Sequence, residues 1–259
     1  MRYTAVCKWM AVRLAAIVLA MAGGAAVAGP LLVSAAASLT NAFADVVASY
    51  QQQYPDASVA LNFAASGVLL QQIDKGAPVD VFASADQQTM DLAQQRGLTG
   101  MRHDFARNSL VVIVPKTGSV RIAPAHLSRL AHLQQDAVSR IAIGNPAIVP
   151  AGAYTRRALS AAQLWPLLQS KTIQTYSVRQ ALDYVARGEV DAGFVYRTDA
   201  ALMPDKVSIA FGVAQNERIL YPIAAIKSSA NGAEALRFIG FIRSAAGQAI
   251  LAKHGFLPP

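Results

Sequence analysis

Short apolar runs alternate with amphipathic helical patterns along the sequence from residue 29 to residue 259. The first apolar run, 31–33, has the length and composition of a buried strand. Four apolar side chains then recur at the i, i+3, i+4, i+7 spacing of one helix face, and Pro55 ends this pattern. These four are Phe43, Val46, Val47 and Tyr50. An alternation of this kind predicts α/β sheets of parallel strands with helices on both faces.

The same alternation continues to the C-terminus. Further strands are expected at 59–63, 79–83, 110–114, 140–143, 172–175, 193–196, 207–211 and 219–226. The expected helices include those at 86–96, 126–134 and 151–162, one between Ser177 and Gly188, and two that close the chain. Neither an internal repeat nor a low-complexity linker interrupts the pattern. If the chain forms two lobes, ordinary strands rather than a linker segment must therefore connect them.

The first 28 residues have the organisation of a secretory signal peptide. Arg2, Lys8 and Arg13 give a positive start, the run 14–25 is apolar, and a small-x-small cleavage pattern ends at Ala28. The alternative is a membrane anchor, but the apolar run is shorter than the roughly 20 residues that span a bilayer. We therefore predict that residues 1–28 are cleaved and that the mature protein is periplasmic.

Charge and cysteine content narrow the classes of partner. Three of the 23 basic residues and none of the 15 acidic ones lie in the signal segment, so the net charge falls from +8 to +5 after cleavage. The remaining basic residues are scattered singly, which argues against a nucleic-acid surface. The only cysteine, Cys7, precedes the apolar run. The mature chain therefore has no disulfide, no thiol nucleophile and no lipid-anchored cysteine.

Four predicted helix starts share one chemistry. The loops 35–40, 64–67, 149–152 and 176–178 offer small or hydroxyl side chains and no charged one. A helix start presents unpaired N–H groups and a positive dipole end, and small residues let an anion approach the backbone. A single serine before a helix is usually a helix cap, so each loop taken alone is weak evidence. Parallel α/β folds gather such loops at one end of the sheet, so four together indicate an anion site.

The chain resembles the periplasmic molybdate-binding proteins (ModA) of ABC-type importers. The resemblance covers essentially the whole mature chain. It is carried by AAASLTNA at 35–42, GAPVDVF at 76–82, SADQ at 84–87, NSLVV at 108–112, VPAGAY at 149–154, VRQAL at 178–182, and VY with TDA at 195–200. These motifs occur in the family's order and spacing, and together they are highly specific.

The resemblance implies a two-lobed, type II-like periplasmic binding protein in which each lobe is a mixed, mostly parallel sheet flanked by helices. We expect lobe 1 to comprise 29–108 and 199–259, and lobe 2 to comprise 109–198. The expected ligand is molybdate or tungstate, held between the lobes. The resemblance also implies a membrane permease of an ABC importer as partner, a monomeric protein, and neither a cofactor nor a metal beyond the molybdenum of the oxyanion.

Carried over position by position, the ligand contacts implied by the family are Ser38, Ser66, Ala151, Val178 and Tyr196. The two serines would act through hydroxyl and backbone N–H, Ala151 and Val178 through backbone N–H, and Tyr196 through its phenol. The loop of the second serine departs from the family's pattern, because a single Ser66 stands between alanine and glycine. Proton-free molybdate only accepts hydrogen bonds, and none of these residues is acidic. A selective phosphate site would instead need an acceptor.

Two alternatives compete with this prediction. A hydrolase would need a catalytic motif, but the chain has no Gly-x-Ser-x-Gly elbow and no phosphate-binding glycine loop, and its four histidines stand singly. A binding protein could instead take sulfate, an amino acid or ferric iron, of which the last two need charged or clustered ligands. We interpret Tyr154 and Tyr176 as packing or rim residues. Arg156, Arg157 and Arg179 would raise the local potential without touching the ligand.

Overall fold

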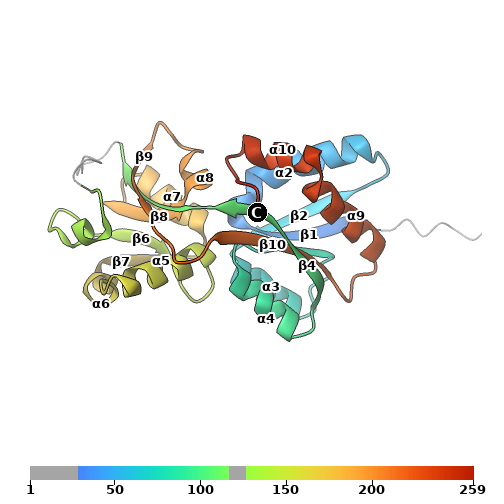
Figure 1. Ribbon diagram of the computed structural model, residues 1–259, viewed down its shortest axis with the longest axis horizontal. Coiled ribbons are helices and arrows are strands. Elements are labelled where there is room, and N and C mark those ends of the chain that lie inside the picture. Colours follow the sequence, from blue (N-terminus) through green and yellow to red (C-terminus); the bar gives the residue numbers. More distant parts are fainter. Residues whose placement is uncertain (1–28, 117–126) are drawn as a thin grey trace, which may run out of the picture.

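The protein is described by a computed structural model that covers residues 29–116 and 127–259. Two five-stranded sheets, each flanked by helices, form two lobes that lie side by side (Figure 1). The predicted signal peptide, 1–28, and the start of the helix expected at 126–134 lie outside the described residues. In the described residues no single helix is long and apolar enough to cross a membrane, and only a pair bent by 62°, Gly232–Arg243 with Ala245–Lys253, passes that test jointly.

The first lobe is built on a sheet with the strand order β2-β1-β3-β10-β4. Its strands are β1 (Leu31–Ala36), β2 (Val59–Ala64), β3 (Val81–Ala83), β4 (Thr99–Asn108) and β10 (Ile219–Ile226). β1 pairs in parallel with β2 and β3, whereas β10 pairs antiparallel with β3 and β4. Four strands therefore point one way and only β10 runs against them.

The second lobe repeats this plan with the order β7-β6-β8-β5-β9. Its strands are β5 (Leu110–Pro115), β6 (Ile141–Gly144), β7 (Thr172–Thr175), β8 (Ala192–Tyr196) and β9 (Val207–Val213). β6 pairs in parallel with β7 and β8, and β5 is the single reversed strand. The predicted fold class, two mixed and mostly parallel sheets with helices, is confirmed.

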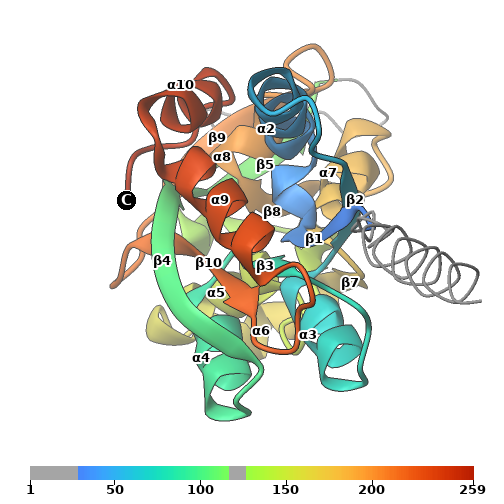
Figure 2. The same cartoon turned by 90° about the vertical axis from the view of Figure 1, so that its right-hand side faces the viewer.

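Helices cover the sheets because each has one apolar face. Six helices of the described chain belong to the first lobe: η1 (Ala37–Leu39), α2 (Thr40–Gln53), α3 (Ser66–Asp74), α4 (Gln87–Gln95), α9 (Gly232–Arg243) and α10 (Ala245–Lys253). Among the described residues the second lobe contains η3 (Leu130–Gln134), α5 (Pro150–Ala161), α6 (Trp165–Leu168), η4 (Gln169–Lys171), α7 (Val178–Ala186) and α8 (Arg197–Ala200). In α2 the buried residues include the stripe predicted from the sequence. Figure 2 shows α2 and α10 on one side of the first sheet and α3 and α4 on the other.

Two elements differ from the sequence-based expectation. The long strand β4 was not predicted, because its sequence TGMRHDFARN is largely polar and only four of its ten positions are buried. It forms the edge of the sheet, where one side of a strand can face water. The helix expected to end at 134 is only the short 3-10 helix η3 within the described residues. The leucines of the expected helix, Leu127, Leu130 and Leu133, recur every third residue, which is the period of a 3-10 helix.

The chain crosses between the lobes twice, between β4 and β5 and again between β9 and β10 (Figure 1). β9 pairs with β5 from Leu110↔Val213 to Pro115↔Val207, so residues 207–213 belong to the second sheet. The expected return to lobe 1 at residue 199 is therefore too early. An antiparallel strand completes the edge of the second sheet before the chain leaves it.

Candidate functional site

A small pocket lined mostly by buried residues, here called the cavity, lies between the two lobes and is the candidate site. All five residues singled out from the sequence line it: Ser38, Ser66, Ala151, Val178 and Tyr196. The remaining lining residues are small or apolar, namely Ala36, Ala37, Ala65, Ala85, Val149 and Pro150. Among the residues that the structure describes, no charged side chain lines this cavity.

The topology explains why residues so distant in sequence meet. All six parallel strands, β1, β2, β3, β6, β7 and β8, end at or lead into residues that line the cavity. Ser38 lies in η1, Ser66 and Val178 begin α3 and α7, and Ala151 is the second residue of α5. The carboxyl ends of parallel strands lie at one edge of a sheet, and the two lobes turn these edges toward each other.

Backbone N–H groups at these helix starts are the first set of donors. The first turn of an α-helix leaves its N–H groups without intrahelical partners, and its dipole end is positive. Small residues bring this backbone close to its neighbours. A Cβ on Gly152 would lie 1.8 Å from the carbonyl oxygen of Gly144, so only glycine lets α5 start this near to β6. Ser66, Ala151 and Val178, in the first turns of α3, α5 and α7, line the cavity.

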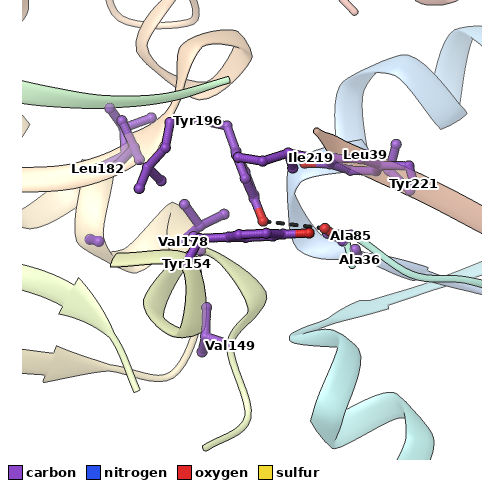
Figure 3. Close-up of a cluster of buried hydrophobic side chains, with 14 of the residues drawn as sticks. Ala36, Leu39, Ala85, Val149, Tyr154, Val178, Leu182, Tyr196, Ile219 and Tyr221 are labelled. Carbon is purple, nitrogen blue, oxygen red and sulfur yellow. Dashed lines mark hydrogen bonds between the residues drawn. The ribbon is translucent and has the colours of Figure 1, made fainter. Parts of the chain in front are cut away.

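Three hydroxyl groups form the second set of donors. Ser38, Ser66 and Tyr196 are all at least 97% buried. The Ser66 hydroxyl oxygen accepts the Ala85 N–H at 3.0 Å, and the Tyr196 phenol donates to the Ala85 carbonyl oxygen at 3.4 Å (Figure 3). Burial raises the pKa of Tyr196 well above its ordinary value, so the phenol keeps the one proton that it donates here to Ala85.

Arg179 joins the lobes beside the cavity without lining it. Its guanidinium donates to the Asp199 carboxylate at 2.6 Å within its own lobe. The same group donates to the Asn41 side-chain oxygen at 2.8 Å and to the Ser38 carbonyl oxygen at 3.2 Å, both in the first lobe. Burial raises the pKa of Asp199 to about 6, and Arg179 opposes that shift. We expected Arg179 only to raise the local potential; its bridging contacts were missed.

The lobes also touch directly at Gly67. Its N–H donates to the Ile148 carbonyl oxygen of the second lobe at 3.0 Å. A Cβ at Gly67 would lie 2.8 Å from both the Cα and the carbonyl oxygen of Ile148. The structure is thus a closed arrangement in which a glycine is required at the contact.

The aromatic residues near the site separate into two groups. Tyr154 is buried and belongs to the same hydrophobic cluster as Tyr196, but it does not line the cavity (Figure 3). Arg157 stacks over the Tyr154 ring at 4.5 Å. Tyr176 is 77% exposed and lies outside the cavity. In this structure both therefore occupy packing or surface positions.

Sequence reasoning missed the residues behind the cavity. Tyr221 on β10 contacts the Ser38 hydroxyl at 3.0 Å, and Asn108 on β4 donates to Tyr221 at 3.3 Å. No spacing signal could have linked them, since Asn108 and Tyr221 are 113 positions apart. The motif NSLVV at 108–112, part of the family resemblance, includes Asn108 but gave it no role at the site.

The chemistry of the cavity suits a small anion. Its donors are neutral N–H and O–H groups, and a proton-free oxyanion needs donors alone. In residues 29–116 and 127–259 no group of three or more His, Cys, Asp or Glu side chains is placed to hold a metal ion. Two α/β lobes that enclose a buried cavity lined by donors define a two-lobed solute-binding protein.

Comparison with known proteins agrees with this class. The sequence model of the bacterial extracellular solute-binding proteins matches residues 31–257. The molybdate-binding protein ModA of Escherichia coli (strain K12) is 35% identical over 246 residues, which cover 93% of this chain and 95% of that protein. ModA of Haemophilus influenzae is 32% identical over 234 residues, 89% of this chain and 91% of that protein.

A solved structure extends the comparison. The periplasmic molybdate-binding protein of Azotobacter vinelandii has a TM-score of 0.77 and 27% identity, covering 88% of this chain and 99% of that one. The chain belongs to the bacterial extracellular solute-binding protein family, and its resemblance to the ModA proteins is confirmed.

Proposed function

We propose that this protein captures molybdate, and tungstate with it, and delivers the anion to the membrane permease of an ABC importer. The observation that carries the proposal is the convergence of Ser38, Ser66, Ala151, Val178 and Tyr196 on one buried cavity. Relatives named molybdate-binding protein ModA support the choice of ligand.

Neutral donors are sufficient for tight binding. Burying a bare dianion is costly, so its oxygens must be matched by hydrogen bonds. The hydroxyl and N–H of both serines, the N–H of Ala151 and of Val178, and the Tyr196 phenol make about seven donors. At roughly 1.5–3 kcal/mol each they contribute on the order of 10–20 kcal/mol before ordering costs. A nanomolar dissociation constant needs about 12 kcal/mol.

The cellular setting is part of the proposal. The family, described as extracellular, and the signal-peptide pattern of residues 1–28 support a periplasmic protein. One chain supplies every proposed ligand contact, which supports a monomer. Binding and release involve no covalent step, so the protein is neither an enzyme nor dependent on a cofactor. Turnover of a generic ester by the purified protein would contradict that statement.

Isothermal titration calorimetry of the ligand-free protein tests the choice of anion. Molybdate, tungstate, sulfate and phosphate should be titrated separately at the same ionic strength and pH. We expect molybdate and tungstate to bind with nanomolar to micromolar dissociation constants and sulfate to bind more weakly, because its shorter bonds leave its oxygens farther from a fixed ring of donors. Equal or stronger binding of sulfate would favour a sulfate-binding protein instead.

Substitution of Ser38 by alanine should weaken molybdate binding by about 1–3 kcal/mol, since one oxyanion oxygen loses a donor in a dry site. Titration calorimetry of Ser38→Ala measures the loss. Ser34→Ala is the matched control, because Ser34 is also a buried serine of the first lobe but is absent from the cavity lining. Its affinity should equal that of the wild type. Equal losses in the two variants would remove Ser38 from the site.

Val178 tests a contact made by backbone alone. Val178→Ala keeps the N–H and should change molybdate affinity little. Val178→Pro removes the N–H and should lower the affinity by about 1–3 kcal/mol, while proline is tolerated at the first position of α7. The same titrations, with circular dichroism to verify folding, decide the point. A large loss in folded Val178→Ala would mean that the residue is misassigned.

A further inference from the structure

A chain of buried hydrogen bonds leads from the backbone of Ser109 to the cavity. The Ser109 N–H donates to the Asn108 side-chain oxygen at 2.9 Å. The Asn108 amide nitrogen donates to the Tyr221 hydroxyl at 3.3 Å and to the Thr198 hydroxyl at 2.9 Å. Tyr221 and the Ser38 hydroxyl lie 3.0 Å apart. Asn108, Tyr221 and Ser38 are each at least 93% buried, so water cannot substitute for these partners freely.

The chemistry of each group fixes the direction of this chain. A backbone N–H can only donate, so the Asn108 atom that faces Ser109 is the oxygen and its NH₂ group faces Tyr221. Tyr221 therefore accepts from Asn108. Burial raises the pKa of Tyr221 well above its ordinary value, so its phenol retains a proton. Ser38 is the acceptor within reach, and a buried hydroxyl proton left without an acceptor costs about 1–3 kcal/mol.

The Ser66 hydroxyl is oriented in the same way, but by a different group. The Ser66 hydroxyl oxygen accepts the Ala85 N–H at 3.0 Å, and that N–H cannot act as an acceptor. A hydroxyl that already accepts one hydrogen bond from the protein turns its own proton elsewhere. In both serines the free direction is the cavity that they line.

We propose that Asn108 and Tyr221 are positioning residues that make the Ser38 hydroxyl an obligate donor, so that the site rejects oxyanions carrying a proton. The Ala85 N–H does the same for Ser66. This inference rests on the proposed function, because it concerns selectivity in the same site. Hydrogen phosphate carries the same double charge as molybdate but presents one P–OH group. With both serine hydroxyls directed at the ligand as donors, that proton would oppose a donor at Ser38 and at Ser66, and hydrogen phosphate would bind more weakly than molybdate.

The direct test is Tyr221→Phe, which removes the donor to Ser38 while keeping the ring. The Ser38 hydroxyl can then rotate, and its oxygen can accept a hydrogen bond from the P–OH group of the ligand. We expect molybdate affinity to fall about tenfold and the molybdate-to-hydrogen-phosphate affinity ratio to fall by at least that factor. Titration calorimetry at pH 8 measures both. Tyr50→Phe is the matched control, since Tyr50 is an equally buried phenol bonded to Glu234 and Arg237 instead, and it should leave the ratio unchanged.

A double variant separates positioning from general structure. Because Tyr221 acts through Ser38, adding Tyr221→Phe to Ser38→Ala should cost no further molybdate affinity. Additive losses, or an unchanged affinity ratio in Tyr221→Phe, would overturn the inference. If Tyr221→Phe does not fold, Asn108→Leu can replace it. This variant removes the hydrogen bond that Asn108 donates to Tyr221, and it should also lower the molybdate-to-hydrogen-phosphate affinity ratio. Wild-type protein that fails to bind molybdate would refute the proposed function itself, which is a distinct outcome.

Discussion

Gly67→Val is expected to hold the lobes apart and to reduce molybdate affinity at least 100-fold while leaving each lobe folded. The first atom of the new side chain would lie 2.8 Å from the Ile148 backbone, and backbone cannot move aside as a flexible side chain does. Separation of the lobes withdraws the donors of Ala151, Val178 and Tyr196 from an anion bound at the serines. Losing three charge-assisted hydrogen bonds, each contributing roughly 1.5–3 kcal/mol, is more than enough for a 100-fold reduction in affinity.

Titration calorimetry measures the affinity, and small-angle scattering shows whether molybdate still closes the lobes. Gly240→Val is the control, because a Cβ at Gly240 on α9 meets nothing within 4 Å. Wild-type affinity in Gly67→Val, with unchanged scattering, would show that the contact between Gly67 and Ile148 is not required for binding.

Arg179→Met is expected to destabilise the protein by about 3 kcal/mol at pH 8, because it leaves the Asp199 carboxylate buried without its partner. The same change removes the bonds to Asn41 and to the Ser38 carbonyl oxygen, which link the lobes. Molybdate affinity should therefore fall as well. Chemical denaturation followed by circular dichroism measures the first effect, and titration calorimetry the second.

The stability lost in Arg179→Met should depend on pH, because the Asp199 carboxyl group titrates. In the wild type, burial raises the pKa of Asp199 from 3.8 to about 6, so its protonated form is favoured by folding. Its contribution to stability is full below pH 3.8 and is lost as the pH rises through about 6. Without Arg179 the pKa rises further. The deficit of Arg179→Met should therefore be smaller at pH 5 than at pH 8.

Asp199→Asn in the Arg179→Met background is the rescue variant. It removes the buried charge, so it should restore most of the stability lost at pH 8 but not the bonds between the lobes. A deficit in Arg179→Met that does not change with pH, and that Asp199→Asn does not relieve, would contradict the role given to the ion pair.

The hydrophobic pattern of the sequence predicted those helices and strands whose own residues have a regular apolar spacing. The buried residues of α2 include its apolar stripe, and the largely buried β10 has the predicted bounds, because burial on one face or both leaves a regular apolar pattern. The edge strand β4 has mixed exposure and leaves no such spacing. The return between the lobes was placed too early because the partner of β9 is β5, a choice that only the assembled sheet reveals.

The candidate site was accessible from sequence for a related reason. Its donors stand at the ends of strands, where short uncharged loops and helix starts can be recognised, and the family resemblance named five of them. The groups that orient these donors were not accessible. Tyr221 and Asn108 reach Ser38 only through the pairing of β10 with β4, and Arg179 reaches Asn41 only when the lobes close.

The central claim is that uncharged N–H and O–H groups from separate turns hold a dianion away from water. A crystal structure of the molybdate complex, with the metal located by its anomalous scattering, tests it most directly. We expect molybdenum between Ser38 and Tyr196, with every short contact to its oxygens made by neutral donors. An anion contacted by Lys, Arg or a metal ion, or bound outside this cavity, would contradict the account.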